Sequence, residues 1–205
     1  MSDITPEMLL HAYANGYFPM AESRHAKELY WFYPETRGII PLDAFHVSQS
    51  LRKLLKKNPF TLTTDRAFDS VIQACANRDE TWINDEIIAL YSELHRLGFA
   101  HSVEVWSDAL GEGQQARSED KLLVGGLYGV ALGGAFFGES MFSAVPNASK
   151  LALVHLVEQL NQLGYQLLDA QYVNAHLKQF GIQEIPRDDY LKRLHDALLI
   201  KPNAW

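Results

Sequence analysis

The stretch from Gly125 to Gln171 constrains the fold of this chain most strongly. Two apolar runs interrupted by glycines, 122–133 and 134–142, are followed by an amphipathic segment at 149–163. A last short apolar run leads into Asp169. Apolar runs bounded by turn residues are typical of strands that are buried on both faces. We therefore expect a hairpin, a helix and a strand, with polar side chains collected at the strand ends.

Carboxylates occur where these apolar runs would bury them. Glu139 lies inside the second run and Asp169 at the end of the last one. Burying a carboxylate is costly unless it is hydrogen-bonded or paired. Gln171 follows Asp169 by two residues, which on a strand places both side chains on one face. Taken alone, the three residues favour a buried polar network that orders the strand ends over a reaction centre.

Composition limits the class of protein. A chain of 205 residues can form one substantial core, or a core with a small accessory domain, and its 47% hydrophobic content is ordinary for a globular protein. The chain lacks a membrane-length apolar run and a signal peptide, and its single cysteine, Cys75, fits a reducing compartment. We expect a cytoplasmic protein with no membrane partner. The net charge of −7 argues against indiscriminate nucleic-acid binding.

Further elements are expected before this stretch. Two aromatic stretches, 17–20 and 30–34, show no clean period and are expected to be irregular. Asp65 is expected to cap a helix, and the polar residues 108–120 to form an exposed hairpin loop. The remaining elements are expected as helices at 5–15, 48–57 and 84–98, and as strands at 38–41, 60–64 and 101–107.

One predicted helix carries a concentrated positive charge. Arg52, Lys53, Lys56 and Lys57 lie on one face of the helix at 48–57, with no acid between them. Like charges at this spacing repel each other mildly, so water or an anionic partner must face them. A solvated face is the ordinary explanation. In a chain of net charge −7, however, this concentration favours contact with phosphates.

Common catalytic motifs are missing from the sequence. The eight histidines show no metal-ligand spacing, and neither HExxH nor CxxC occurs. The segment Gly138–Phe142 lacks the second glycine of a serine nucleophile elbow, and the glycine-rich run at 125–134 matches no phosphate-binding loop. We therefore expect neither a metal nor a cofactor.

Several short motifs, in order along nearly the whole chain, carry a family resemblance. They are AYANGYFPM (12–20), TWI (81–83), HSVEVW (101–106), GESMFS (138–143), NASK (147–150), LDAQ (168–171), HL (176–177) and IPR (185–187). In these motifs the chain resembles the leucyl/phenylalanyl-tRNA–protein transferases. It resembles a short form of the family that lacks the N-terminal extension of longer members.

The resemblance and the order of predicted elements imply an α+β fold. The catalytic domain, expected at 43–205, would be similar to the acyl-CoA N-acyltransferases, with a small N-terminal subdomain at 1–42. The resemblance also implies the activity, which is transfer of Leu or Phe, with Met as a third candidate, from aminoacyl-tRNA to the N-terminal Lys or Arg of a protein. The product would be marked for degradation by the N-degron pathway.

The resemblance implies three catalytic residues. Asp169 would orient or help to deprotonate the attacking amine, Gln171 would position the carbonyl, and Glu139 would hydrogen-bond the aminoacyl group. An aminoacyl-tRNA ester is already activated, so no covalent enzyme intermediate is needed.

The resemblance also implies the substrate-binding residues. Trp82 would stack on the terminal adenine of the tRNA, and an apolar pocket would hold the transferred side chain. The pocket residues are Leu127, Phe136, Met141 and Leu156, and further substrate contacts would come from Ser143 and Asn174.

The chain departs from the family pattern in two places. Phe18-Pro19-Met20 stands where FPW is common, so Met20 or Trp31 would supply the second wall of the adenine site. Ala144 stands after Ser143 where an arginine is common, which would weaken a contact to the tRNA backbone.

Two other functions are compatible with the residues alone. One is an acyl-CoA-dependent N-acyltransferase, although the turn at 146–150 lacks a glycine-rich pyrophosphate loop. The other is a non-catalytic RNA-binding module that uses the basic helix.

Overall fold

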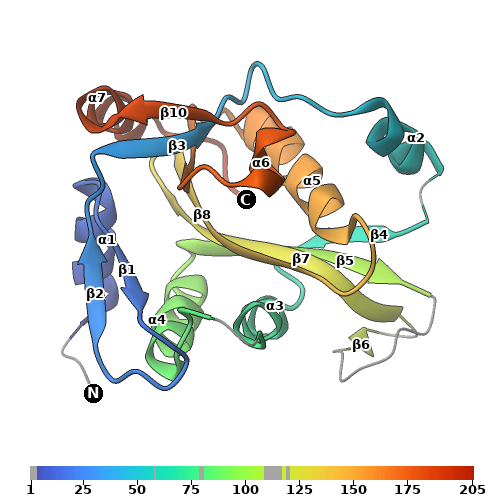
Figure 1. Ribbon diagram of the computed structural model, residues 1–205, viewed down its shortest axis with the longest axis horizontal. Coiled ribbons are helices and arrows are strands. Elements are labelled where there is room, and N and C mark those ends of the chain that lie inside the picture. Colours follow the sequence, from blue (N-terminus) through green and yellow to red (C-terminus); the bar gives the residue numbers. More distant parts are fainter. Residues whose placement is uncertain (1–3, 58, 79–80, 109–116, 119–120) are drawn as a thin grey trace.

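The computed structural model describes residues 4–57, 59–78, 81–108, 117–118 and 121–205. Within these residues, an eight-stranded sheet runs through the middle of the molecule in the order β10-β3-β9-β8-β7-β5-β4, with β6 beside β7 (Figure 1). Its strands are β3 (Thr36–Ile40), β4 (Thr61–Thr64), β5 (Ala100–Ser107), β6 (Arg117–Ser118), β7 (Lys121–Leu132), β8 (Ala135–Ser143), β9 (Leu167–Gln171) and β10 (Gln183–Pro186).

Helices cover both faces of the sheet. α3 and α4 lie on one face, and α5 crosses the other, while α1 packs against α4 and α7 at one end (Figure 1). The helices are α1 (Pro6–Ala14), α2 (Gln49–Lys57), α3 (Phe68–Ala76), α4 (Asp85–Arg96), α5 (Ala148–Leu163), α6 (Ala175–Lys178) and α7 (Arg187–Leu198). Each face of the sheet carries its own hydrophobic core. The mixed α/β fold with one large sheet is the class of fold that the sequence predicts.

The predicted hairpin, helix and strand are confirmed. β7 and β8 are antiparallel neighbours, and α5 then crosses the sheet to place β9 parallel to β8. β8 and β9 are paired only from Ala135–Phe137 to Leu167–Asp169, and beyond these residues the two strands separate. Side chains at this point of separation have open space on one side, so it is the place to look for a site.

The start of α5 is unusual. Asn147 takes the left-handed conformation, with φ of 69°, and its side chain does not cap the helix. Instead, the hydroxyl of Ser143 accepts the backbone N–H of Ser149 and donates to the carbonyl of Val145. This arrangement replaces the usual side-chain N-cap and fixes the start of α5 next to the end of β8.

The two aromatic stretches are strands, contrary to the expectation of irregular chain. β1 (Phe18–Ala21) and β2 (Leu29–Phe32) form a two-stranded antiparallel sheet beside α1. The sequence does not predict this hairpin, because Pro19 interrupts the first strand and aromatic residues on both faces remove the usual alternation of apolar and polar residues. Phe18 is buried, whereas Trp31 is exposed on the opposite face.

The expected cap at Asp65 is also wrong. Its backbone is left-handed, with φ of 57°, and its carboxylate accepts the N–H of Ser102 at 2.8 Å. The same carboxylate lies 2.7 Å from Nδ1 of His101. α3 begins after Ala67 without a side-chain cap. Asp65 therefore joins a turn to the neighbouring strand β5 and does not start the helix.

The N-terminal region packs continuously against the rest of the chain. Leu9, Tyr13 and Phe18 belong to the same core as α3 and α4. β3, which lies within the expected subdomain at 1–42, is a strand of the large sheet. The division at residue 42 stays a prediction. Residues 109–116 and 119–120 of the expected hairpin loop lie outside the described residues.

In the parts of the chain that the structure describes, none of the helices has the length and apolarity needed to cross a membrane.

Candidate active site

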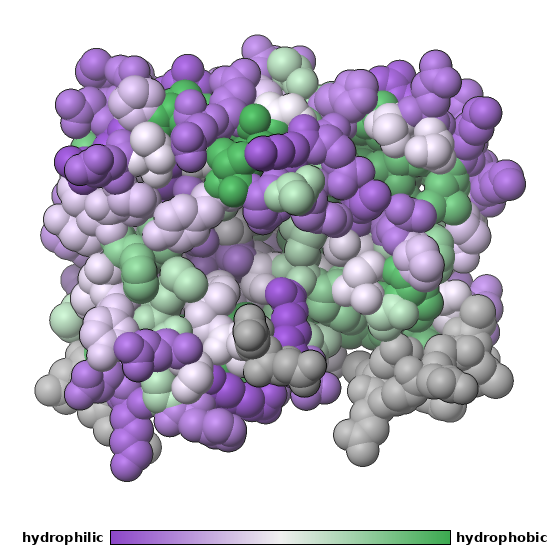
Figure 2. All heavy atoms as spheres, in the orientation of Figure 1, coloured by the Kyte–Doolittle hydropathy of each residue, from purple (hydrophilic) through white to green (hydrophobic). Residues whose placement is uncertain are grey.

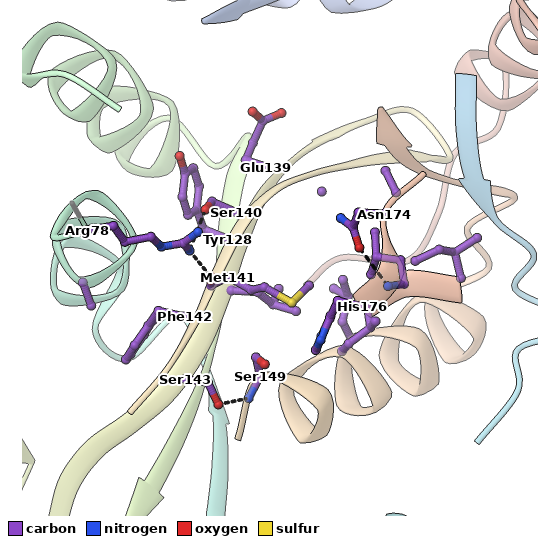
Figure 3. A pocket seen from close by; sticks show the side chains of 18 of the residues that line it. Arg78, Tyr128, Glu139, Ser140, Met141, Phe142, Ser143, Ser149, Asn174 and His176 are labelled. Atoms are coloured by element: carbon purple, nitrogen blue, oxygen red, sulfur yellow. Dashed lines mark hydrogen bonds between the residues drawn. The ribbon is translucent and has the colours of Figure 1, made fainter. Parts of the chain in front are cut away.

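A cleft of about 820 Å³ opens where β8 and β9 separate. It extends along both faces of the outer half of β8, so residues from α3 line one side and residues from α5 and α6 line the other (Figure 3). Eight of the predicted site residues line it, namely Trp82, Leu127, Glu139, Met141, Ser143, Leu156, Asp169 and Asn174. Gln171 touches Glu139 from outside this lining. Phe136 and the four basic residues of α2 do not line the cleft.

Glu139 is placed in the cleft by a β-bulge. The pairing of β7 with β8 shifts register here, because Tyr128 pairs with Ser140 and the next residue, Gly129, pairs with Gly138. Glu139 is therefore the extra residue of β8. Bulges of this kind redirect a side chain out of the regular alternation. A register shift depends on both strands, so the sequence of β8 alone could not predict it.

Three neutral groups donate hydrogen bonds to the Glu139 carboxyl. The Tyr13 hydroxyl donates to Oε1 at 2.6 Å, the Tyr91 hydroxyl to Oε2 at 3.2 Å, and the Gln171 amide to Oε1 at 3.1 Å. The Tyr13 and Tyr91 hydroxyls are also within hydrogen-bonding distance of each other, and because each has a single proton, they supply two of the three contacts among Tyr13, Tyr91 and Glu139 at a time. Burial raises the pKa of Glu139 to about 7, although the Tyr13 hydrogen bond opposes the rise. Both protonation states are therefore accessible near neutral pH, which suits a proton acceptor.

Asp169 has a different environment. Its carboxylate is fully buried and forms an ion pair with Arg37, with Nη2 of Arg37 2.6 Å from Oδ2. Arg37 Nε lies 2.9 Å from Oδ1, the Tyr190 hydroxyl donates to Oδ2 at 2.8 Å, and the Gln171 backbone N–H donates to Oδ1 at 2.8 Å. Arg37 is itself stacked between the rings of Phe18 and Tyr190. Asp169 is therefore an ion-paired carboxylate that also accepts hydrogen bonds from Tyr190 and the Gln171 backbone, an arrangement typical of a positioning residue.

Gln171 connects the two carboxylates. Its backbone N–H binds Asp169 and its side-chain amide binds Glu139. Its φ of 60° lies in the left-handed region, which is uncommon for a residue other than glycine. Strained backbone of this kind persists where surrounding contacts over-determine it, often at functional sites. Asp169 and Gln171, two residues apart on β9, thus belong to one hydrogen-bonded network, and their joint role at a reaction centre stays a prediction.

The α5 side of the cleft is apolar. Leu127, Met141 and Leu156 line it, as the sequence predicts, and Leu153 and Leu168 add to it. Phe136 is fully buried beneath this lining, where its ring lies 5.5 Å from that of Trp205. Its influence on a ligand would therefore be indirect.

Polar residues border the apolar side. Ser143 ends β8 beside Ser149 of α5, while Asn174 is the N-cap of α6 and His176 lies in its first turn (Figure 3). The Asn174 side chain caps α6 by accepting the N–H of Leu177 at 2.9 Å. Burial, with a smaller effect from nearby Lys150, lowers the pKa of His176. This end of the cleft can therefore offer neutral hydrogen-bonding groups to a ligand.

The α3 side carries Trp82, Arg78 and Tyr128. The β1–β2 hairpin lies next to it, because the Ala21 N–H donates to the Trp82 carbonyl at 3.2 Å. Met20 is half-buried and packs against the same core as Trp82, whereas Trp31 is 40% exposed. Met20 is therefore better placed than Trp31 to stand in for the missing aromatic residue.

The basic residues of α2 are exposed, away from the reaction centre. In Figure 2 hydrophilic side chains cover α2 at the upper right of the molecule. Lys53 and Lys57 line a second hollow, of about 300 Å³, together with Asn147 and Lys150 of the α5 start. Arg52 and Lys56 are exposed without lining this hollow. This hollow with its three lysines therefore reaches the start of α5, where Ser149 lines the main cleft.

Several site residues were missed in the sequence. Arg37 and Tyr190 bind Asp169 from distant parts of the chain, and Tyr13 and Tyr91 bind Glu139. Tyr13 lies in the motif AYANGYFPM, and Arg37 is a charged residue in a short apolar strand. Either signal could have suggested a buried polar partner, but neither identifies which partner it is.

The described residues contain no group of three or more His, Cys, Asp or Glu side chains that could hold a metal ion.

The architecture is that of a mixed α/β protein built around one large sheet. The structure of FemX aligns with a TM-score of 0.53 over 87% of this chain and 66% of that one, at 12% identity, which shows similarity of fold. Family models for the leucyl/phenylalanyl-tRNA protein transferase and its N-terminal domain match residues 39–195 and 2–35. The chain belongs to this family, and it is therefore an aminoacyltransferase enzyme.

Curated members of the same family are similar to this chain over nearly its full length. The leucyl/phenylalanyl-tRNA–protein transferase of Paramagnetospirillum magneticum is 56% identical, over 100% of this chain and 93% of its own. That of a Ruegeria species is 52% identical over 95% of this chain and 87% of its own. Family membership decides against the acyl-CoA-dependent enzyme and the non-catalytic RNA-binding module.

Proposed function

We propose that the protein transfers leucine or phenylalanine, with methionine as a third candidate, from aminoacyl-tRNA to the N-terminal Lys or Arg of proteins. The observation that carries this proposal is the division of one cleft into an apolar side and a side with Trp82 and Arg78, with Glu139 on the Arg78 side of β8. An amino-acid side chain fits the first side, a nucleoside fits the second, and the ester that joins them would lie beside Glu139.

The reaction needs the protein mainly to position the ester and the amine and to supply a proton acceptor. The neutral acceptor amine attacks the ester carbonyl, a C–N bond forms, and the C–O bond to the ribose breaks. The nitrogen gives up one proton and the departing ribose oxygen gains one. An α-amino group has an unperturbed pKa near 8, so at neutral pH most of it must also be deprotonated before attack.

We assign the proton acceptor to Glu139. Its carboxyl lies in the cleft, and its raised pKa of about 7 makes it a stronger base than an ordinary glutamate. Of the two roles expected for Asp169, the ion pair with Arg37 favours orientation over deprotonation. Asp169 would hold the backbone of Gln171, whose amide in turn holds Glu139.

The substrate contacts follow from the same geometry. Leu127, Met141 and Leu156 would select the transferred side chain by size and apolarity, and Trp82 would stack on the terminal adenine. Met20 would form the second wall of the adenine site. Contacts from Ser143 and Asn174 would border the aminoacyl group.

The exposed basic residues of α2 would bind tRNA phosphates. Arg52, Lys53, Lys56 and Lys57 would supply this contact, with Lys150 closest to the cleft. The acceptor would be marked for degradation by the N-degron pathway. Because its donor is charged tRNA, we propose that the enzyme acts in the cytoplasm.

One assay tests the proposal. Purified protein is incubated with tRNA charged with radiolabelled leucine and with peptides that begin with Arg, Lys or Ala and are otherwise identical. We expect label in the Arg and Lys peptides and little in the Ala peptide. Equal labelling of all three would refute the acceptor assignment, and labelling of none would refute the transfer itself.

A further inference from the structure

Unpartnered polar atoms mark the cleft as a place built for a ligand. Among the residues that the structure describes, the buried side-chain atoms without a hydrogen-bond partner are Nε2 of His101, Oη of Tyr128 and Nε2 of His176. Tyr128 and His176 line the cleft, on opposite sides of β8. Buried polar groups almost always have partners, so each exception needs an explanation.

Tyr128 is the sharper exception because its whole side chain is buried. It is 0% exposed, and its ring meets those of Phe68 and Tyr91 edge-on, at centroid distances of 5.8 and 5.6 Å. Figure 3 shows its hydroxyl on the same side of β8 as Glu139 and Arg78. The packed neighbours hold the ring in place, so the hydroxyl cannot swing away from the cleft that the residue lines.

The neighbouring tyrosines indicate that the unpaired Tyr128 hydroxyl has a role. Tyr13 and Tyr91 occupy the same region, and both hydroxyls donate to Glu139. A phenylalanine at position 128 would keep the ring contacts and avoid the unpaired hydroxyl. Burial raises the pKa of Tyr128 well above its usual value, so the hydroxyl stays protonated and remains a donor.

We propose that the Tyr128 hydroxyl donates a hydrogen bond to the terminal ribose of the bound aminoacyl-tRNA, and this rests on the function proposed above. The cleft places Tyr128 on the side of Trp82 and Arg78, where the nucleoside would lie. The ribose connects the base to the ester, so it passes between Trp82 and Glu139. Its 2′ oxygen is an acceptor that remains attached throughout the reaction and can satisfy the phenol.

The first test is the variant Tyr128→Phe, which removes one oxygen and keeps the ring. We expect the single-turnover rate of leucine transfer to fall about 3- to 10-fold, the worth of one hydrogen bond. The melting temperature should stay the same or rise, because an unpaired buried hydroxyl has been removed. A purely structural tyrosine predicts the opposite, a lower melting temperature with an unchanged rate.

Tyr165→Phe is the matched control. The Tyr165 hydroxyl accepts a hydrogen bond from Trp205 at 2.6 Å on the α5 side of the sheet, and Tyr165 does not line the cleft. This variant should lose stability and keep its transfer rate. The two phenylalanine variants are therefore expected to change the two measured quantities in opposite ways.

The second test identifies the ribose oxygen. Leucine is placed on the 3′ oxygen of a tRNA that ends in 2′-deoxyadenosine, and single-turnover rates are measured with the unmodified protein and with Tyr128→Phe. We expect the deoxy substrate to slow the unmodified protein about as much as the variant does, and to slow the variant no further. Independent, multiplying effects would overturn the ribose assignment.

The outcomes also separate this inference from the proposed function. If the unmodified protein transfers leucine normally and Tyr128→Phe transfers it equally well, the inference is wrong and the proposed function stands. If the unmodified protein transfers leucine from no charged tRNA, the proposed function fails first.

Discussion

The guanidinium of Arg37 lies 2.6 Å from the carboxylate of Asp169, between side chains that are 2% and 0% exposed. The two residues are 132 positions apart in the chain, and Arg37 also donates to the carbonyl of Gly16 at 3.0 Å. One buried ion pair thus ties β3, β9 and the segment after α1 together, directly behind the cleft.

Breaking this pair should destabilise the protein. Asp169→Asn leaves the Arg37 charge buried without its partner, which typically costs about 3–5 kcal/mol of unfolding free energy. Asp189→Asn is the control, because Asp189 pairs with Lys192 on the surface and should cost less than about 1 kcal/mol. Urea unfolding of both variants measures the difference. Equal losses would show that the Arg37–Asp169 pair is no more important to the fold than a surface pair.

The rate of transfer should depend on the protonation of Glu139. Its pKa is raised to about 7, mainly by burial, so the carboxylate becomes available as pH rises through this value. We expect the single-turnover rate to increase with pH through about 7. Deprotonation of the acceptor amine should add a second increase near its usual pKa of about 8.

The variant Glu139→Gln separates these two effects. It should lower the rate by on the order of 10²-fold and lose the increase near pH 7 while keeping the one from the amine. The folded fraction of Asp169→Asn should lose much less. A Glu139→Gln protein with a normal rate and pH profile would show that water or the substrate takes the proton.

The apolar side of the cleft should select the transferred residue. Hydrophobic pockets discriminate by about 1–3 kcal/mol per methylene, so leucine should be transferred faster than valine by roughly 10-fold or more. Leu156→Ala enlarges the lining and should shift the preference from leucine towards phenylalanine. Phe136→Leu lies beneath the lining and should lower stability with less change in preference. Competition between leucyl- and phenylalanyl-tRNA measures the shift, and an unaltered ratio in Leu156→Ala would rule out this selection.

The basic residues of α2 should contribute affinity without selecting the amino acid. Changing Lys53 and Lys57 together to Ala should weaken tRNA binding and reduce the salt slope by about one unit per lost phosphate contact. Lys192→Ala with Lys201→Ala removes the same charge from the region of α7 and is the control. Filter binding over a range of salt concentrations gives the slope. If both pairs of substitutions act alike, only overall charge matters.

The sequence predicted most of the fold because its central pattern is strong. The apolar runs of β7 and β8, the helix α5 and the strand β9 were all recognised from periodicity and turn residues. The β1–β2 hairpin was missed because Pro19 and aromatic residues on both faces remove the alternation that normally identifies strands. The role of Asp65 was missed because its partner, the Ser102 backbone, lies on another strand.

The sequence predicted which residues form the candidate site better than it predicted their hydrogen-bond and ion-pair partners. Family motifs pointed to Glu139, Asp169 and Gln171, and these three do form one hydrogen-bonded network. The sequence could not show that Arg37 neutralises Asp169, nor that a register shift turns Glu139 into the cleft. Both depend on pairing between distant strands, which determines whether a carboxylate acts as a base or as a positioning group.

The separation of β8 from β9 has a consequence for how the enzyme loses activity during thermal unfolding. Only three residue pairs join β8 to β9, and only three join β9 to β3, so the sheet is narrowest at β9. Strands β9, β3 and β10 lie on one side of the seam between β8 and β9, and β8, β7, β5 and β4 lie on the other. Glu139 lies on the β8 side of this seam, while Asp169 and Gln171 lie on the β9 side. Local opening at this seam would separate Glu139 from Gln171 and so abolish the site, and local openings can precede global unfolding. Loss of activity on heating should therefore precede the main unfolding transition.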